Sequence, residues 1–299
     1  MSEFFSGIQT KNGILFDPFN DSHEHLIKKH NLNDKTRDPD FVRLEIIPIA
    51  EPWNKDPNKW VLHVDQDILP SWFSEESAKQ EMWAALQTAW KETLIINEEV
   101  EELKDRSVRW IAKSHIKKMS GKSWALEVFN STIDEMREKS SIKFVGNNSH
   151  IDAMEGESSV KMLQHFSSIR VMKENSSVEE MKEHSRVGWQ TGKSIVKGMR
   201  DHSHIGTMDV KSGVMLMQNF SSVGSMCGDS RVDEMEGNSS VGTMNEYATI
   251  GTAGGQSIVR IASPNARVER RYDSATVINY AGDYPVIYAS YKKRAVFLN

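Results

Sequence analysis

Four ring-bearing residues recur at a spacing of 18 in the second half of the chain: Phe166, His184, His202 and Phe220. In a coil of 18 residues their rings would stack on one edge, with neighbours about 5 Å apart. Such a ladder could bind a partner, and its histidines could sense pH or hold a metal ion. Two imidazoles without a third ligand at a matching spacing are weak evidence for zinc. We therefore favour a ladder that stabilises turns and keep a binding strip as the alternative.

Imidazoles and carboxylates also gather before residue 70, at His23, His25, His30, His63, Asp65 and Asp67. These are the ligand types of hydrolytic metal sites. However, an H-x-H spacing at a helix start does not place both rings on one helical face. A D-x-D pair after a strand is typical of a turn. The sequence therefore predicts neither a metal site nor a cofactor.

Basic and tyrosine side chains alternate near the end of the chain: Arg267, Arg270, Arg271, Tyr272, Tyr280, Tyr284, Tyr288, Tyr291, Lys292, Lys293 and Arg294. Interleaved rings and cations can stack bases and contact phosphates, or dock an acidic protein. The cluster coincides with the loss of a methionine column, which favours an end cap whose rings cover the last coil. Binding through the basic residues, to nucleic acid or protein, remains the less favoured alternative.

No catalytic motif appears in the sequence. The single cysteine, Cys227, lies at an expected turn with no base near it in the repeat, which argues against a nucleophile. One cysteine also excludes a disulfide framework and a cysteine-based zinc site. The sequence contains no G-x-S-x-G motif of serine hydrolases, no phosphate-binding P-loop and no glycine-rich dinucleotide-binding motif. We expect a protein that is not an enzyme, and keep a site in the N-terminal region as an alternative.

A nine-residue repeat positions most of these candidates. From Ser131 the units read STIDEMREK, SSIKFVGNN and SHIDAMEGE and continue to Asp283, and weaker units begin near residue 106. Position one is Ser or Ala, position three is almost always Val or Ile, and position six is Met in eleven units. A period of nine with frequent Gly and Ser is not helical. Small, β-branched and Met columns between polar turns predict a parallel β-solenoid with these columns inside.

Two units, or 18 residues, form one coil in the arrangement that we favour. At position four, glycine recurs every 18 residues, at Gly188, Gly206, Gly224 and Gly242. Position nine alternates between an uncharged or aromatic series and a mostly charged series, which predicts two different edges. About ten coils at a strand spacing of ~4.8 Å would give a rod roughly 45–50 Å long. A triangular coil of three units is the alternative.

Charge and tryptophan content divide the chain near residue 104. Residues 1–104 carry a net charge of −9 and five of the eight Trp, whereas residues 105–299 carry +4. We expect an acidic α+β head over 1–104, an all-β solenoid over 105–283 and a C-terminal cap over 284–299.

Within the head, the expected element order is β-α-β-β-α. Asp21 forms a capping box with Glu24 and should open the first helix. The expected strands and the amphipathic second helix cover residues 12–17, 41–49, 60–67 and 74–94. The second helix should bury Met82, Leu86, Ala89, Trp90 and Leu94 on one face.

The tandem S-S-V-x-x-M-x-x-N units, with FDPFNDSHE, FVRLE and LHVDQDILPSWF in the head, resemble uncharacterised proteins of bacteriophages and bacterial prophages. The resemblance covers nearly the whole chain. It implies a phage setting and no established activity. Calcium-binding nonapeptide solenoids fit less well, because they need G-G-x-G-x-D, which no unit here contains.

We therefore expect a non-catalytic interaction protein that uses a rigid solenoid to bind a host or phage protein, a host defence protein among the candidates. A virion-associated structural component is the alternative. A mean hydropathy of −0.53 and 26% charged residues argue against a membrane protein. The N-terminus shows no secretory signal, so we expect the host cytoplasm or the virion. A homo-oligomer stays open, because solenoid ends expose sheet edges.

Overall fold

The computed structural model describes residues 5–33, 39–49, 54, 56–261, 263–279 and 290–291. The chain divides into two compact units, Met1–Leu94 and Ile95–Asn299, which we call the head unit and the solenoid unit. This division falls ten residues before the boundary at residue 104 that the charge composition predicts. The acidic residues after Leu94 already form strands of the solenoid sheets, so composition and fold do not change at the same residue.

The head unit is built on a four-stranded antiparallel sheet with the order β2-β1-β3-β4. Its elements are β1 (Phe5–Thr10), β2 (Gly13–Phe16), α1 (His23–Lys29), β3 (Phe41–Pro48), a 3₁₀ turn η1 (Pro57–Lys59), β4 (Trp60–Val64) and α2 (Glu75–Thr93). The sequence predicted every strand but β1, so the order is β-β-α-β-β-α. The missed strand is central to the sheet, and its Phe5 and Ile8 are buried.

Both helices of the head unit begin at a serine. The Ser22 hydroxyl accepts a hydrogen bond from the backbone N–H of His25, and the Ser74 hydroxyl accepts one from Ser77. Short polar side chains satisfy free N–H groups at helix starts in this way. The prediction that Asp21 opens α1 is therefore wrong by one residue.

Helix α2 packs its apolar side on the sheet. The structure confirms burial of four of the five predicted residues, Met82, Leu86, Ala89 and Trp90. Met82 lies so close to β1 that a Cβ at Gly7 would be 2.6 Å from its sulfur. The Trp90 ring lies 5.4 Å from the Trp60 ring. The fifth residue, Leu94, was predicted wrongly, because the helix ends at Thr93 and Leu94 begins a strand of the solenoid.

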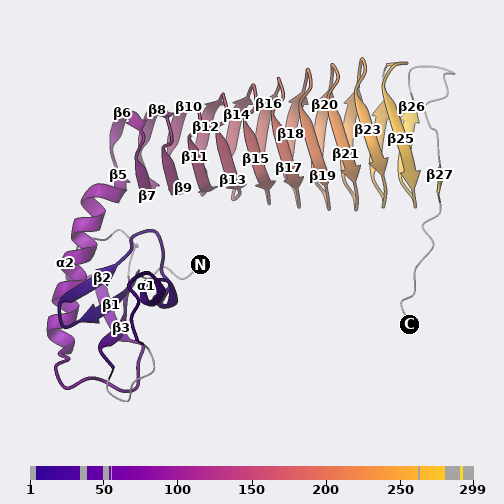
Figure 1. Ribbon diagram of the computed structural model, residues 1–299. Helices are drawn as coiled ribbons and strands as arrows, with labels where there is room; N and C mark the ends of the chain where they lie inside the picture. Colours follow the sequence, from indigo (N-terminus) through magenta and orange to yellow (C-terminus); the bar gives the residue numbers. More distant parts are fainter. Residues whose placement is uncertain are drawn as a thin grey trace, which may run out of the picture. The chain divides into compact units, whose positions relative to one another are not determined.

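The solenoid unit consists of short parallel strands, seen as successive arrows in Figure 1. They are β5 (Leu94–Ile96), β6 (Glu99–Lys104), β7 (Ser107–Ala112), β8 (His115–Ser120), β9 (Trp124–Phe129), β10 (Thr132–Met136), β11 (Ser141–Gly146), β12 (His150–Met154), β13 (Ser159–Leu163), β14 (Ser168–Met172), β15 (Ser177–Met181), β16 (Arg186–Gln190), β17 (Ile195–Met199), β18 (His204–Met208), β19 (Gly213–Met217), β20 (Ser222–Met226), β21 (Arg231–Met235), β22 (Ser240–Met244), β23 (Thr249–Ala253), β24 (Ile258–Ile261), β25 (Arg267–Tyr272), β26 (Thr276–Asn279) and β27 (Ser290–Tyr291). The even-numbered strands form one sheet and the odd-numbered strands form another, which we call the even and odd sheets.

The strand register shows how many units make a coil. Residues pair with partners 18 further along, such as Ile133 with Ile151 and Met136 with Met154. Successive units alternate between the even and the odd sheet, so each coil contains two nine-residue units. This confirms the two-unit coil, and the three-unit alternative is wrong.

Three columns of side chains fill the interior of the solenoid. Within one unit, Ser176, Val178 and Met181 are completely buried, as their counterparts are in nearly every coil. A buried Val or Met contributes ~1.5–3 kcal/mol, which offsets the entropy lost on ordering each coil. Gln190 interrupts the Met column. It is also completely buried, and its Nε2 donates to the carbonyls of Ser194 and Gly213, both at 2.9 Å.

The chain changes sheet at position eight of the unit, where the backbone is left-handed. The φ angle is +72° at Gly192, +56° at Glu174 and +58° at Val210. Glycine adopts this conformation freely, whereas other residues are strained. A glutamate at this position can bind the neighbouring coil, as the Glu174 carboxylate accepts the Gly156 backbone N–H at 2.8 Å. This contact helps to offset the strain of a non-glycine residue.

Candidate binding surface of the solenoid

The four recurring rings stack on one edge of the solenoid unit, as their spacing predicts. Ring centroids are 4.8 Å apart between Phe166 and His184, 5.2 Å between His184 and His202, and 5.2 Å between His202 and Phe220. The rings are inclined to their neighbours by only 7° to 22°. We call this set the ring ladder. Each ring extends from position nine of its unit, so the coil repeat sets the stacking distance.

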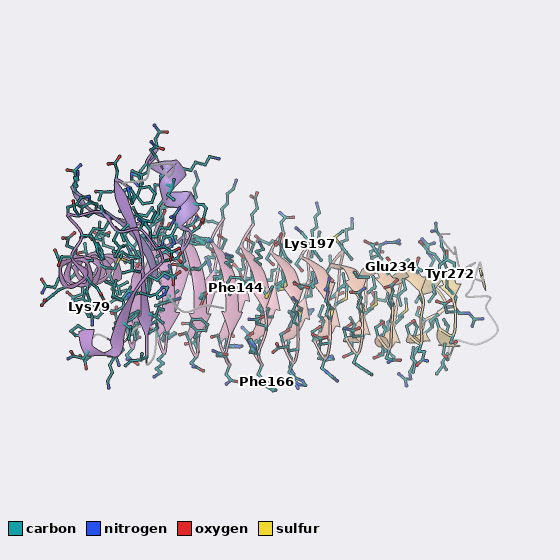
Figure 2. All side chains as sticks on the ribbon, turned by 90° about the horizontal axis from the view of Figure 1, so that it is seen from below. Lys79, Phe144, Phe166, Lys197, Glu234 and Tyr272 are labelled. Carbon is teal, nitrogen blue, oxygen red and sulfur yellow. The ribbon has the colours of Figure 1, made fainter. Side chains whose placement is uncertain are left out.

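The ring ladder is open to solvent. Phe166 is 64% exposed and Phe220 is 56% exposed, and Figure 2 shows Phe166 at the rim of the solenoid. Neighbouring rings stack on both faces of His184 and His202 and on one face of each phenylalanine, so the outward ring edges form the accessible part of the ladder. Exposed apolar side chains in a continuous row often mark an interaction surface.

Position eight provides a polar border beside the ladder. The Nε2 atom of His165 lies 3.3 Å from Oε1 of Glu183. In the next pair of coils, Nδ2 of Asn219 donates to Oδ1 of Asp201 at 3.1 Å. These contacts run from coil to coil and order two carboxylates next to the rings.

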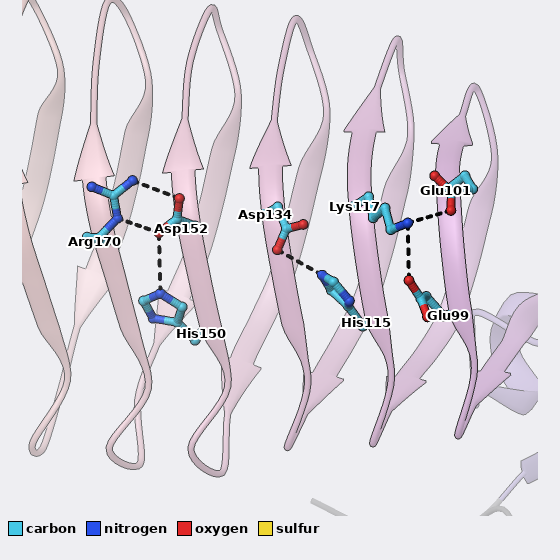
Figure 3. Close-up of polar contacts among 8 residues, drawn as sticks. All are labelled: Glu99, Glu101, His115, Lys117, Asp134, His150, Asp152 and Arg170. Atoms are coloured by element: carbon cyan, nitrogen blue, oxygen red, sulfur yellow. Dashed lines mark hydrogen bonds and ion pairs between the residues drawn. The ribbon is translucent and has the colours of Figure 1, made fainter.

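A second row of polar side chains lies on the outer face of the even sheet, as Figure 3 shows. Arg170 forms a two-point ion pair with Asp152, with 2.7 Å between Nη2 and Oδ2. This hydrogen bonding by Arg170 lowers the pKa of Asp152. Nearer the start of the sheet, Nε2 of His115 lies 2.8 Å from Oδ1 of Asp134.

The same row begins with a lysine held between two glutamates. The Lys117 ammonium lies 2.6 Å from Glu101 and 3.2 Å from Glu99, and the hydrogen bond to Glu101 raises the pKa of Lys117. Exposed pairs of this kind contribute little to stability. They do neutralise one another, which makes this row a weaker docking surface than the ring ladder.

Two serine–histidine pairs lie on the even sheet, and a catalytic serine would need such a pair. His150 Nδ1 lies 2.9 Å from the Ser168 hydroxyl, and His204 Nδ1 lies 2.9 Å from the Ser222 hydroxyl. The Nε2 atom of His150 lies 3.8 Å from Oδ1 of Asp152, which is too far for a hydrogen bond, and Arg170 already binds this carboxylate. A catalytic triad needs a carboxylate hydrogen-bonded to the histidine, so this group does not form one.

Glycine occupies position four on the later strands of the even sheet. A Cβ at Gly206 would lie 2.6 Å from the carbonyl oxygen of Gly188, and one at Gly242 would lie 2.5 Å from that of Gly224. No side chain fits at these positions unless the coil shifts. The glycine recurrence in the sequence therefore reflects close stacking of neighbouring coils.

The C-terminal basic cluster is only partly assembled among the residues that the structure describes. Arg267 and Arg270 are exposed, whereas Arg271 and Tyr272 are partly buried. Glu269 lies 3.2 Å from Arg231 and 3.7 Å from Arg267, and its pKa is lowered chiefly by the hydrogen bond from Arg231. The other basic candidates, Lys292, Lys293 and Arg294, lie outside the described residues, as do Tyr280, Tyr284 and Tyr288. Binding through this cluster stays a prediction.

An open hollow of about 820 Å³ lies on the odd sheet beside this cluster. Its lining includes Leu216, Glu234, Gly237, Thr252, Arg270 and Tyr272. The hollow thus mixes apolar, acidic and basic side chains. Cys227 has no role in it and is instead near the Ser225 hydroxyl, 3.6 Å away, on the other sheet.

In the head unit, two of the candidate ligands, His23 and Asp65, lie close together, and a third residue that was not a candidate joins them. The Nδ1 atom of His23 lies 3.5 Å from Oδ2 of Asp65, and Glu45 joins them. The sequence did not single out Glu45, although it lies opposite His63 once β3 and β4 pair. Among the described residues, the other candidates do not belong to this group: His25, His30, His63 and Asp67.

No family model, curated protein or solved structure matches this chain. Among the residues that the structure describes, no helix is long and apolar enough to cross a membrane. On the described part of the solenoid unit, the ring ladder is a regular row of stacked rings whose end phenylalanines are more than half exposed.

Proposed function

We propose that this chain is a non-catalytic interaction protein that binds a protein partner through the ring ladder. The observation that supports this proposal is a row of four stacked rings, with its two end phenylalanines more than half exposed. Aromatic side chains are enriched at protein interfaces. Rings already held in place lose little conformational entropy on binding, which favours affinity.

The chemistry of the ladder suggests what the partner presents. Ring edges carry the positive side of the aromatic quadrupole and pack well against apolar groups and the faces of other rings. The adjoining carboxylates of Glu183 and Asp201 attract basic groups. The proposed partner surface therefore combines apolar or aromatic side chains with lysine or arginine beside them.

The resemblance of the sequence to phage and prophage proteins gives the proposal a setting. The partner would be a host or phage protein, and inhibition of a host defence protein is the version that we favour. This version places the chain in the host cytoplasm. A virion-associated structural role is the alternative, and mass spectrometry of purified particles distinguishes the two.

The test compares a ladder variant with a matched aromatic variant on the opposite edge. Tyr247 occupies position nine of the other series and is 63% exposed. Tagged wild type, the double variant Phe166→Ala/Phe220→Ala and the control Tyr247→Ala are used to capture proteins from host lysate, and each is checked by thermal unfolding. We expect one partner to be captured by wild type and control and to be reduced at least about ten-fold by the double variant. Equal capture by all three proteins, or no specific partner, would count against the proposal.

A further inference from the structure

We propose that the head unit binds a divalent cation of the Zn²⁺ type through His23, Glu45 and Asp65. Each residue offers one ligand atom, and these three atoms all lie within 4.8 Å of one another. Imidazole nitrogen and carboxylate oxygen are both ligand types of zinc, and three protein ligands leave a fourth position open for water. The proposal is independent of the ring ladder, which belongs to the other unit.

The pairing of β3 with β4 brings together two of the three ligands, Glu45 and Asp65. Glu45 lies directly opposite His63, and the backbone N–H of Asp65 donates to the carbonyl of Arg43 at 3.0 Å. Side chains alternate between the two faces of a sheet, so residues 43, 45, 63 and 65 share one face. Two carboxylates from different strands therefore meet on that face.

Helix α1 supplies the imidazole. Leu26 of α1 packs with Phe41, which lies four residues before Glu45 and hence on the same face of β3. This contact holds the helix over the face that carries the two carboxylates. His23, the first residue of α1, is thereby brought against Asp65.

The orientation of His23 is the observation that separates this group from an ordinary acidic surface. Its side chain is only 7% exposed, and its Nε2 lies 2.9 Å from the carbonyl oxygen of Leu44. A carbonyl can only accept, so Nε2 carries the proton of this hydrogen bond. The other nitrogen, Nδ1, points to the carboxylates. Metal-binding histidines are commonly oriented in this way, by a hydrogen bond from the second ring nitrogen to a backbone carbonyl.

The distances allow a cation to bind with small movements. Zinc bonds of about 2.0–2.2 Å in a tetrahedron place ligand atoms roughly 3.3–3.6 Å apart. The 3.5 Å between His23 and Asp65 already fits. Glu45 lies 3.5 Å from His63, which can orient its carboxylate. The Asp65 side chain is 54% exposed and has room to adjust.

Calorimetric titration of the metal-free full chain with Zn²⁺ tests the site. We expect about one equivalent to bind with an affinity that Asp65→Asn and Glu45→Gln each weaken at least about ten-fold. Asp67→Asn is the matched control, because this exposed carboxylate lies two residues from Asp65 and outside the group. Zinc binding that is absent, or that is unaffected by Asp65→Asn and Glu45→Gln, would overturn the proposal.

A second readout separates a cation site from an ion pair between a protonated His23 and Asp65. Added Zn²⁺ should raise the unfolding temperature of wild type and of Asp67→Asn, because a ligand that binds only the folded state stabilises it. It should not raise that of Asp65→Asn. Replacing His184 and His202 with alanine should leave the effect unchanged. Stabilisation by zinc that is lost with the ladder histidines and kept by Asp65→Asn would show that the cation binds elsewhere.

Discussion

Replacing Gly224 with alanine tests whether the glycine column keeps the coils in register. Gly224 lies in β20 at position four, and a Cβ there would be 2.6 Å from the carbonyl oxygen of Gly206. That distance is well inside ordinary van der Waals contact, so either the strand or its neighbour must move. The matched control is Gly198→Ala in β17, where the nearest atom, the carbonyl oxygen of Glu179, would be 3.7 Å away.

The magnitude follows from the difference between the two sites. Neither glycine has a positive φ, so alanine lowers the entropy of the unfolded chain at both and should stabilise each by ~0.4–1 kcal/mol where it fits. At Gly224 an overpacking cost of ~1–3 kcal/mol is added. We therefore expect Gly198→Ala to be neutral or slightly stabilising. Gly224→Ala should be less stable than this control by ~1–3 kcal/mol.

Thermal unfolding followed by far-ultraviolet circular dichroism measures this difference. For a unit of this size, 1 kcal/mol corresponds to ~2–4 °C, so the two variants should differ by ~2–12 °C in Tm. Each coil is stabilised by its neighbours, so the clash should also broaden the transition of Gly224→Ala. Equal Tm values for Gly224→Ala and Gly198→Ala would refute the argument that coil stacking, and not chain flexibility, requires glycine at position four.

Four further substitutions test the core, the turns and the outer face of the solenoid. Ser123→Ala removes hydrogen bonds of 2.8 and 2.7 Å and should lower the free energy of unfolding in urea by ~1–2 kcal/mol. Ser221→Ala should leave the free energy of unfolding unchanged or raise it, because that buried hydroxyl has no partner among the described residues. An equal loss of free energy in Ser123→Ala and Ser221→Ala would contradict this reasoning. Val210→Asn should raise the free energy of unfolding by ~1 kcal/mol, since a β-branched residue is strained at φ +58°, and a lower value would show that the strain is absent. Asp152→Asn tests the Arg170 ion pair by urea unfolding across pH. Because the folded-state pKa of Asp152 is lowered, its contribution is present above the ordinary value of 3.8 and is lost as the pH falls through the folded value; a difference from wild type that persists in acid would contradict the pairing.

The sequence was sufficient to predict the solenoid because its columns repeat. Serine at position one, Val or Ile at position three and Met at position six are buried as expected, and the 18-residue recurrence of glycine and of rings gave the coil size. The boundary was predicted less well. β6 (Glu99–Lys104) is acidic like the head, so a change in charge could not reveal that it already pairs with β8.

The head unit shows why single elements are harder to predict. β1 reads FSGIQT, and its Ser, Gly and Gln hide a strand that is buried by tertiary contacts. The candidate cation site was missed for a related reason. Glu45 approaches His23 only through the β3–β4 register and the packing of α1, and neither can be read from local spacing. The ring ladder was accessible to sequence analysis because one repeat sets all of its distances.

A photo-crosslinking amino acid at position 220 tests most directly whether the ring ladder contacts a partner. The residue replaces Phe220 in one protein and Tyr247 in another, since both side chains are more than half exposed and lie on opposite edges. After irradiation in host cells, we predict one crosslinked protein partner from position 220 and none of that mass from position 247. Crosslinking that is absent at position 220, or equal at the two positions, would contradict binding through the ring ladder.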